Sequence, residues 1–492
     1  MGRLSMGFHC WTMGGALLLL LLVVVEGTSS SFLHHSSSKM SPTILKVKSK
    51  ASTANKRKTI SSTGLRGFGS PSPSSSAAIT NGRGITVTSP TTIIIDRSPT
   101  ALTFYDYLHK HGAESSLSRV GLGHTAGGLR GVVALRDIKK GEVIIDIPYE
   151  LSIDLGRENS DPTLPATTFL QMYCAWKSSN SNSDSIPPDR GSYFNMIPPY
   201  YYPYSSSEEE EGSSNNTKWC DCLGSTDFYS QVALDMLQSP RIVEETLQRK
   251  ELVNARYDRD VLPMTKMSSN LYRWREEEDD DGNGNGNSDM KIVSNEHLRW
   301  ATWVITSRVL TVQGSSTDES SNSNTPARRL LIPLIDMCNH DRDSPHILTG
   351  RAVSGSLLKV VAGCNVRAGD AITIAYGGGV EGNDRFIQDY GFLDAGSGGS
   401  STEEKEAASA ATAVAEGYRI VARKILGKGR AGLSRMTASD SLRELQALSA
   451  TTLEDDEALL ASGTIVLNDE KMALEYRIGV KRALRLLQEK EQ

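Results

Sequence analysis

Cysteine is scarce in this 492-residue chain, and the six cysteines are not arranged as a metal site. Cys220 and Cys222 form the only close pair, and no second pair accompanies them, although a structural zinc ion needs about four ligands. The remaining four are Cys10, Cys174, Cys338 and Cys364. We therefore interpret all six as thiols and expect no metal.

The apolar run at residues 16–25 is too short to cross a bilayer, which takes about 20 residues. Arg3 precedes it and small residues follow at 27–31, so residues 1–31 are typical of a signal peptide. Residues 32–95 lack Asp and Glu and are rich in Ser, Thr and Lys, as transit peptides are. Together they resemble the bipartite presequence of algae whose plastids have extra membranes. We expect a plastid protein; a mitochondrial precursor and a secreted protein with a linker are the alternatives.

Clustered positive charge is missing from the body of the chain. Residues 1–95 hold ten Lys or Arg and one acid, so the remainder carries 43 basic against 57 acidic residues. This balance argues against a nucleic-acid groove, which draws on clustered Lys and Arg. An acidic body suits a basic segment of a protein as its partner, and the length allows two domains.

The stretch that carries chemistry lies between residues 331 and 394. Two apolar, strand-like runs, residues 331–335 and 371–375, each lead into polar residues. Asp336, Asn339 and His340 follow the first run, and Tyr376 follows the second. Between them, residues 357–361 predict another strand and residues 367–370 a tight turn. Polar groups at strand ends are typical of functional sites.

The motifs Asp336-Met337-Cys338-Asn339-His340, Tyr376-Gly377 and Tyr390-Gly391-Phe392, in this order, resemble the SET domain of protein methyltransferases, which use S-adenosylmethionine (AdoMet). They are most similar to the branch that includes the Rubisco large-subunit lysine methyltransferase and the actin-histidine methyltransferase. The resemblance implies an α+β fold. We expect a β-rich SET domain with a threaded C-terminal segment and a helical insertion, followed by an all-α C-terminal domain.

The resulting domain prediction places the SET domain at residues 96–394, with its insertion at about 150–300. A Gly/Ser linker at 395–402 and a helical substrate-binding domain at 403–492 follow; an oligomerisation module is the alternative for that last part. Polar tracts at 178–184, 205–216 and 276–288 are typical of disordered segments.

Apolar spacing and terminal signals predict helices in each part of the body. They fall at residues 104–112, 163–176, 227–237, 295–310, 416–426, 442–448 and 472–487, with a capping pattern at Thr451-Thr452-Leu453-Glu454-Asp455. Residues 127–148 predict a Gly-rich loop, a strand, a turn and a strand, which in the family form the opening hairpin.

The resemblance also implies roles for individual residues. Tyr376 would be the catalytic residue, with its hydroxyl near the sulfonium and the incoming amine. The expected cofactor-binding residues are Gly128, Leu129, Arg130, Arg308, Asn339, His340 and Phe392. The expected substrate-binding residues are Arg308, Asp336, Tyr376 and Tyr390. Each also has a structural interpretation, such as a core histidine, a helix-end arginine or a half-buried tyrosine.

We expect methyl transfer to a lysine of a non-histone, plastid protein, for which the Rubisco large subunit and an aldolase are candidates. The free amine has a pKa of about 10.4, so the pocket must favour its neutral form. The alternatives are a protein-histidine methyltransferase and a SET domain that only binds peptides. We expect no nucleic-acid partner and, once the presequence is removed, no membrane; the oligomeric state is left open.

Overall fold

The structure is a computed structural model. It describes residues 94–124, 130–158, 161–178, 190–198, 224–267, 270–275, 290–314, 327–379, 382–394, 417–428 and 436–489. Every described residue belongs to the unit that spans Pro42–Gln492. The predicted presequence up to residue 93, the linker 395–402 and nearly all of the three polar tracts lie outside the described residues.

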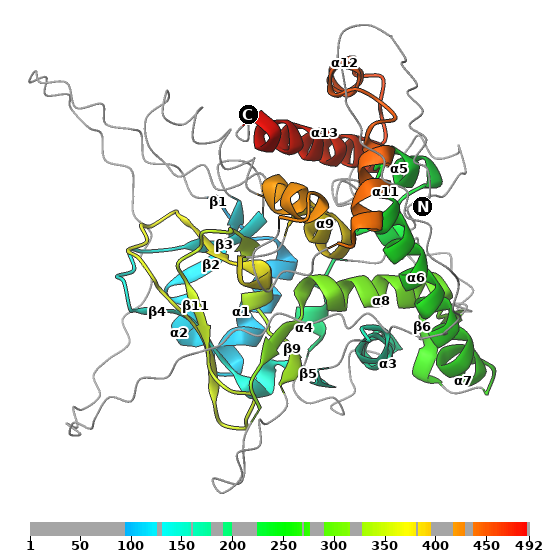
Figure 1. Cartoon of the computed structure of the whole chain (residues 1–492). Coiled ribbons are helices and arrows are strands. Elements are labelled where there is room, and N and C mark those ends of the chain that lie inside the picture. The colour runs from blue at the N-terminus through cyan, green and yellow to red at the C-terminus, as the bar shows by residue number, and fades with distance from the viewer. Residues whose placement is uncertain are drawn as a thin grey trace, which may run out of the picture. The chain divides into compact units, whose positions relative to one another are not determined.

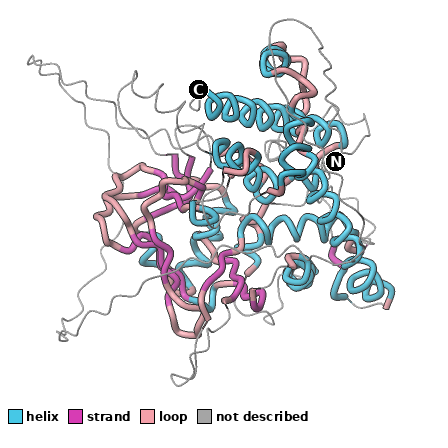
Figure 2. Tube along the Cα trace, viewed as in Figure 1, coloured by secondary structure: helices cyan, strands magenta, loops and turns pink. Residues whose placement is uncertain are grey.

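The strands of the described ranges form four sheets (Figures 1 and 2). The first has the order β1 (Ile94–Ile95), β2 (Val120–His124), β3 (Arg130–Ala134), β13 (Ala371–Ile374) and β10 (Asn339–His340). The second has β11 (Ile347–Thr349), β12 (Leu357–Val361) and β4 (Val143–Pro148), and the third β5 (Ile153–Arg157), β9 (Arg328–Leu331) and β8 (Leu310–Val312). β6 (Arg273–Arg275) pairs with β7 (Met290–Ile292).

Helices make up much of the rest of the described chain and confirm the α+β prediction. The helices are α1 (Pro99–Lys110), α2 (Glu114–Leu117), α3 (Thr163–Ser178), α4 (Gly191–Phe194), α5 (Gln231–Met236), α6 (Pro240–Arg256), α7 (Leu262–Lys266), α8 (Asn295–Arg308), α9 (Asn383–Arg385), α11 (Ala438–Leu448), α12 (Leu453–Ala461) and α13 (Asn468–Glu489). Residues 417–425 are helical as well.

Several local signals give the elements that they predict. Ser98 caps α1 by accepting a hydrogen bond from the Ala101 amide at 3.2 Å, and Gly112, with φ +87°, follows its end. The turn at 367–370 closes through a 3.1 Å bond from the Asp370 amide to the Arg367 carbonyl. β12 has the predicted bounds, and α3 and α8 agree with prediction to within two residues.

The predicted hairpin at residues 127–148 is wrong in its pairing. β3 and β4 belong to different sheets: β3 pairs with β2 and β13, whereas β4 pairs with β12. The connection between them bonds elsewhere, since the Ile138 amide donates to the Val366 carbonyl at 2.9 Å and the Gly141 amide to the Ala362 carbonyl at 2.7 Å. These long-range bonds direct the chain from the first sheet to the second.

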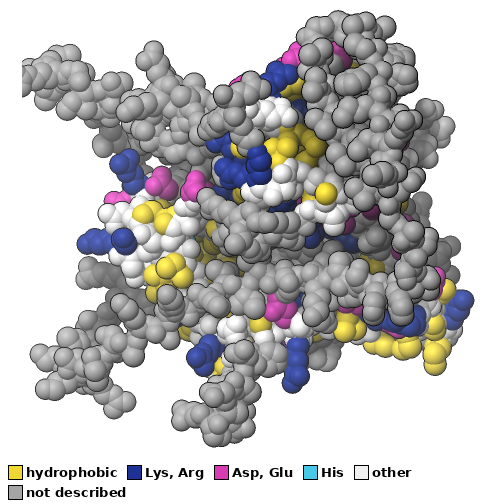
Figure 3. Space-filling model, viewed as in Figure 1, with side chains coloured by type: hydrophobic (Ala, Val, Ile, Leu, Met, Phe, Trp, Pro, Cys, Tyr) yellow, Lys and Arg dark blue, Asp and Glu magenta, His cyan; other side chains and the backbone are white. Residues whose placement is uncertain are grey.

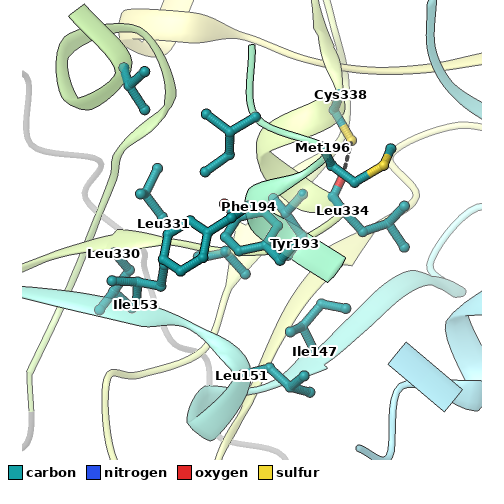
Figure 4. Packing of buried hydrophobic residues seen from close by; sticks show 14 of the residues in the cluster. Ile147, Leu151, Ile153, Tyr193, Phe194, Met196, Leu330, Leu331, Leu334 and Cys338 are labelled. Atoms are coloured by element: carbon teal, nitrogen blue, oxygen red, sulfur yellow. Dashed lines mark hydrogen bonds between the residues drawn. The ribbon is translucent and has the colours of Figure 1, made fainter. Parts of the chain in front are cut away.

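The apolar run at 331–335 is also not a continuous strand. β9 ends at Leu331, the chain turns at Pro333 and Leu334, and a 3₁₀ turn spans Ile335–Met337. Proline cannot donate to a sheet, and Leu334 has φ +69°, a conformation that L residues avoid. Leu334 is nevertheless fully buried among side chains of the main core, close to Cys338 (Figure 4). Burial therefore holds this turn in place directly before Asp336.

Two large clusters of buried side chains, and a third one formed by Leu453, Leu474 and Ile478, stabilise the described chain. The larger cluster joins residues of the three larger sheets with α1, α3 and α8 (Figure 4). The smaller cluster is formed by α5, the start of α6, the helical residues 417–425, α11 and α13. The C-terminal helices thus share a core with helices from the predicted insertion, and they lie beside α5 in Figure 1.

The helical predictions for the insertion and the C-terminal part are confirmed with one change. Residues 227–237 do not form one helix, because a 3₁₀ turn, Thr226–Phe228, precedes α5. Thr452 caps α12, and its hydroxyl accepts from the Asp455 amide at 3.0 Å as predicted. No helix was predicted at the residues that form α6.

The surface of the described part combines charged and apolar areas. Hydrophobic side chains gather at the lower right of the face in Figure 3, and exposed hydrophobic residues of α6 and its surroundings include Leu252 and Met267. Within the described ranges, no helix has the length and apolar character needed to span a membrane.

Candidate active site

The two polar strand ends lie side by side in the first sheet. β10 pairs with β13 in parallel, with Asn339 opposite Thr373 and His340 opposite Ile374. The Asp341 amide extends this pairing by donating to the Ile374 carbonyl at 3.1 Å. Because parallel strands end at the same edge of a sheet, the residues that follow β13 arrive next to His340.

Tyr376 is fixed by two hydrogen bonds to the neighbouring motif. Its backbone amide donates to His340 Nδ1 at 3.0 Å, and its hydroxyl donates to the Cys338 carbonyl at 2.7 Å. Since Nδ1 accepts, a neutral His340 carries its proton on Nε2. Burial raises the pKa of Tyr376, so its hydroxyl stays protonated at neutral pH.

An aromatic cluster surrounds the His340 ring. Ring centroids lie 4.5 Å from Phe386, 5.1 Å from Tyr376 and 6.0 Å from Phe392. Tyr390 stacks on Tyr376 at 4.9 Å. The predicted residues His340, Tyr376, Tyr390 and Phe392 are therefore brought together, and Phe386 joins them although it was not predicted.

One ring nitrogen of this cluster is buried without a hydrogen-bond partner among the described residues. His340 Nε2 has no hydrogen-bond partner among the described residues, and its nearest acid is Asp394, whose Oδ2 lies 3.8 Å away. Arg342 pairs with the same Asp394 oxygen at 2.6 Å. Buried polar atoms without a partner are rare in proteins, so His340 Nε2 is a candidate contact for a ligand.

Asp336 lies two residues before Cys338, in the 3₁₀ turn, and is buried. Its side chain is fully buried, and Tyr193 donates to Oδ2 at 2.8 Å. Arg308 Nη1 lies 3.8 Å from Oδ2 and donates to the Asp336 carbonyl at 3.2 Å. Burial raises the pKa of Asp336 to about 6, although Arg308 and Tyr193 oppose the rise. The other oxygen, Oδ1, has no hydrogen-bond partner among the described residues.

Asn339 is held against β3 through a glycine. Its Nδ2 donates to the Arg130 carbonyl at 3.1 Å, and a Cβ on Gly131 would lie 2.3 Å from that nitrogen. Only glycine permits this approach. The Arg130 guanidinium pairs with Asp96 at 2.8 Å. Gly128 and Leu129, the other predicted residues of this loop, lie outside the described residues.

Sequence reasoning missed three residues of the site. Phe386 had a weak signal, since it precedes Tyr390 by four residues, the spacing of one helical turn. Tyr193 lies 143 residues before Asp336, and Asp394 lies beyond the last motif, so neither had a local signal. The functional roles of all the predicted residues stay predictions.

The arrangement suits binding and positioning of a cation. Aromatic faces attract positive charge, and the rings of Tyr376 and Phe386 both lie against His340. The described ranges hold no group of three or more His, Cys, Asp or Glu that could bind a metal ion.

Comparison with known proteins gives a family and a set of similar structures. The SET domain family matches residues 129–377. Similar solved structures include the SET domain of LSMT bound to lysine and AdoHcy, at 17% sequence identity and a TM-score of 0.47, covering 80% of this chain and 92% of that chain. Rubisco LSMT bound to AdoMet is similar at 16% identity and a TM-score of 0.46, again covering 80% and 92%. No curated protein matches the sequence.

Proposed function

Since the chain belongs to the SET-domain family, we propose that it is an AdoMet-dependent protein methyltransferase that modifies a lysine of a non-histone protein. One observation carries the proposal: within the matched region, Tyr376 is hydrogen-bonded both to His340 Nδ1 at 3.0 Å and to the Cys338 carbonyl at 2.7 Å. The two motifs thus contribute to one site, as a methyl transfer between two bound molecules requires.

The residues present fit AdoMet. When bound, AdoMet supplies a methyl group on a positively charged sulfur, which a nitrogen nucleophile attacks in line. The rings around His340 offer faces that attract such a charge, and His340 Nε2 lacks a partner that a polar ligand group would provide. The described residues proposed to hold it are Arg130, Arg308, Asn339, His340 and Phe392, and Gly128 and Leu129 are proposed with them.

Tyr376 is proposed as the catalytic residue because its hydroxyl oxygen is left to accept hydrogen bonds. The proton is donated to the Cys338 carbonyl, so the lone pairs of the oxygen are left to accept from other groups. An amine N–H or a polarised methyl C–H is a suitable donor to such an oxygen. The burial that raises the pKa of Tyr376 would also favour the neutral form of an amine beside it.

Histidine is the second candidate acceptor, and one observation favours it. Asp336 Oδ1 is buried and has no hydrogen-bond partner among the described residues. We propose that it accepts from one N–H of a substrate imidazole, which would orient the flat ring and leave the other nitrogen free to react. Identification of the modified side chain by mass spectrometry separates the two acceptors.

The experiment uses methyl-labelled AdoMet with the purified protein and a plastid stromal extract. We expect incorporation into one protein, for which the Rubisco large subunit and an aldolase are the candidates. Tyr376→Phe should lower the transfer rate far more than it lowers the affinity for AdoMet measured by calorimetry. Tyr257→Phe is the matched control, since Tyr257 also donates to a backbone carbonyl, that of Val293 at 3.1 Å.

Three outcomes would change the proposal. Equal losses of rate and affinity in Tyr376→Phe would assign Tyr376 to binding alone. AdoMet binding without transfer to any protein would leave a binding protein rather than an enzyme. Absence of both would favour a SET domain that binds peptides only.

Residues 1–95 are proposed to direct the protein to a plastid. Their composition is the support, since an apolar run precedes a segment without acids. A fluorescent protein fused behind these residues should enter plastids of a cell with such organelles. Secretion or mitochondrial fluorescence would contradict the proposal.

A further inference from the structure

α6 presents three charged side chains at intervals of four residues to the segment that carries the last aromatic motif. Arg241, Glu245 and Arg249 recur one helical turn apart, so they share a face of the helix. Glu245 accepts from Gln388 at 3.1 Å, and Arg241 lies 3.8 Å from the Asp384 carboxylate. These three side chains therefore lie along the segment that begins at α9 and continues through Gln388.

Arg249 makes the most extensive contacts of the three. Its guanidinium donates to Asp389 Oδ1 and to the Gln388 carbonyl, both at 2.8 Å. On its other side it donates to Asp227 at 3.1 Å and to Thr226 Oγ1 at 3.2 Å. A planar guanidinium with several acceptors holds its partners in one orientation, which a lysine ammonium does not do.

The backbone that Arg249 contacts has an unusual geometry. Phe386–Tyr390 forms a π-helical turn, closed by a 2.9 Å bond from the Gly391 amide to the Phe386 carbonyl. Gly391, with φ +83°, then reverses the chain towards Phe392. Such turns are rare and are frequently found at functional sites. Here the turn ends at Tyr390.

The contact reaches the candidate active site in two steps. Asp389 and Gln388 directly precede Tyr390, whose ring stacks on that of Tyr376 with an interplanar angle of 28°. Burial raises the pKa of Asp389, while Arg249 opposes the rise and favours the carboxylate that it binds. Loss of the guanidinium would remove both the charge partner and the donor to the Gln388 carbonyl.

We propose that Arg249 is a positioning residue of the active site, which holds the π-helical turn so that Tyr390 lies against Tyr376. The inference rests on the proposed methyltransferase function and adds a residue from the helical insertion to it. The hydrogen bonds of Arg249 go to Gln388 and Asp389 in the turn, so Arg249 would act on Tyr390 through the turn. A misplacement of about 1 Å in such a site lowers rates by roughly 10²-fold.

The first test compares Arg249→Met with Arg256→Met in the full protein. Arg256 lies on the same helix and has a similar exposure (13% against 15%), but its ion-pair partners are Asp161 and Asp260, which lie outside residues 383–394. Amide hydrogen exchange should become faster at residues 386–391 in Arg249→Met and stay unchanged there in Arg256→Met. Unchanged exchange in both variants would overturn the proposal.

This readout needs no substrate, so it separates the inference from the proposed function. If the wild-type protein transfers no methyl group, the proposed function is wrong. The exchange result would still decide whether Arg249 holds the turn. Arg249→Lys, which keeps the charge, should show an intermediate exchange rate and serves if the methionine variant does not fold.

The second test is a double-mutant cycle on the rate of methyl transfer. Arg249→Met should lower the rate by roughly 10- to 100-fold in the wild-type background, with AdoMet affinity changed by less than about threefold. In a Tyr390→Ala background the same change should lower the rate less than about threefold, because the ring that Arg249 is proposed to position is absent. Equal losses in both backgrounds, or the same loss in Arg256→Met, would overturn the proposal.

Discussion

Replacing Asp336 by asparagine should remove a pH-dependent cost to stability. The Asp336 side chain is fully buried and its pKa is raised from 3.8 to about 6. Below about pH 3 the carboxyl is protonated in both the folded and the unfolded protein. Between pH 4 and pH 6 the unfolded chain loses this proton and the folded protein keeps it, so the free energy of unfolding falls as pH rises.

The magnitude follows from the size of the pKa difference. One pKa unit corresponds to about 1.4 kcal/mol, so a rise of about two units costs about 3 kcal/mol once the pH is above 6. Asparagine does not titrate, and its amide oxygen can still accept from the Tyr193 hydroxyl. The stability of Asp336→Asn relative to wild type should therefore increase by about 3 kcal/mol between pH 3 and pH 7.

Urea unfolding followed by tryptophan fluorescence at several pH values measures this difference, because all other titrating groups are common to both proteins. Asp146→Asn is a control of opposite sign. Burial raises the Asp146 pKa, but hydrogen bonds from Ser115 and Ser116 and the nearby Arg119 outweigh it and leave the pKa lowered. That variant should lose stability relative to wild type as pH rises through 4. A pH-independent difference for Asp336→Asn would refute the raised pKa of the buried Asp336 carboxyl.

Two further substitutions test the packing of the site and of the C-terminal helices. Gly131→Ala should weaken AdoMet binding roughly tenfold in calorimetry, because its Cβ would lie 2.3 Å from Asn339 Nδ2, whereas Gly121→Ala, with 3.5 Å to Leu135, should not. Arg477→Met should lower the stability of the C-terminal helices by about 3 kcal/mol in thermal unfolding, because it leaves the buried Asp456 with Lys481 as its remaining charged partner. Arg485→Met, whose pair with Glu454 is exposed, should have no effect, and equal effects would contradict the role of burial.

The elements that the sequence predicted well are those set by local patterns. β12 and β13 read as short apolar runs bounded by a turn, and α8 shows apolar residues at helical spacing. The Thr452 cap follows from residues that are three apart. The motif residues themselves were found through resemblance to a family, and the structure then placed Asn339, His340 and Tyr376 together.

The elements that were missed depend on contacts distant in the sequence. β2 contains two glycines, which are unfavourable in strands, yet Gly123 fits where a Cβ would lie 2.8 Å from the Ile94 carbonyl. The separation of β3 from β4 depends on the bridge between Ile138 and Val366. No pattern within a window of 20 residues contains these pairings, nor the one between Tyr193 and Asp336.

The central claim is that the ends of β10 and β13 form one AdoMet site. Amide hydrogen exchange of the purified protein, with and without AdoMet, tests it most directly. The account predicts slower exchange on AdoMet addition in both the peptide that contains Asn339 and His340 and the peptide that contains Tyr376. Protection of only one of these peptides, or protection confined to α11, α12 and α13, would contradict it.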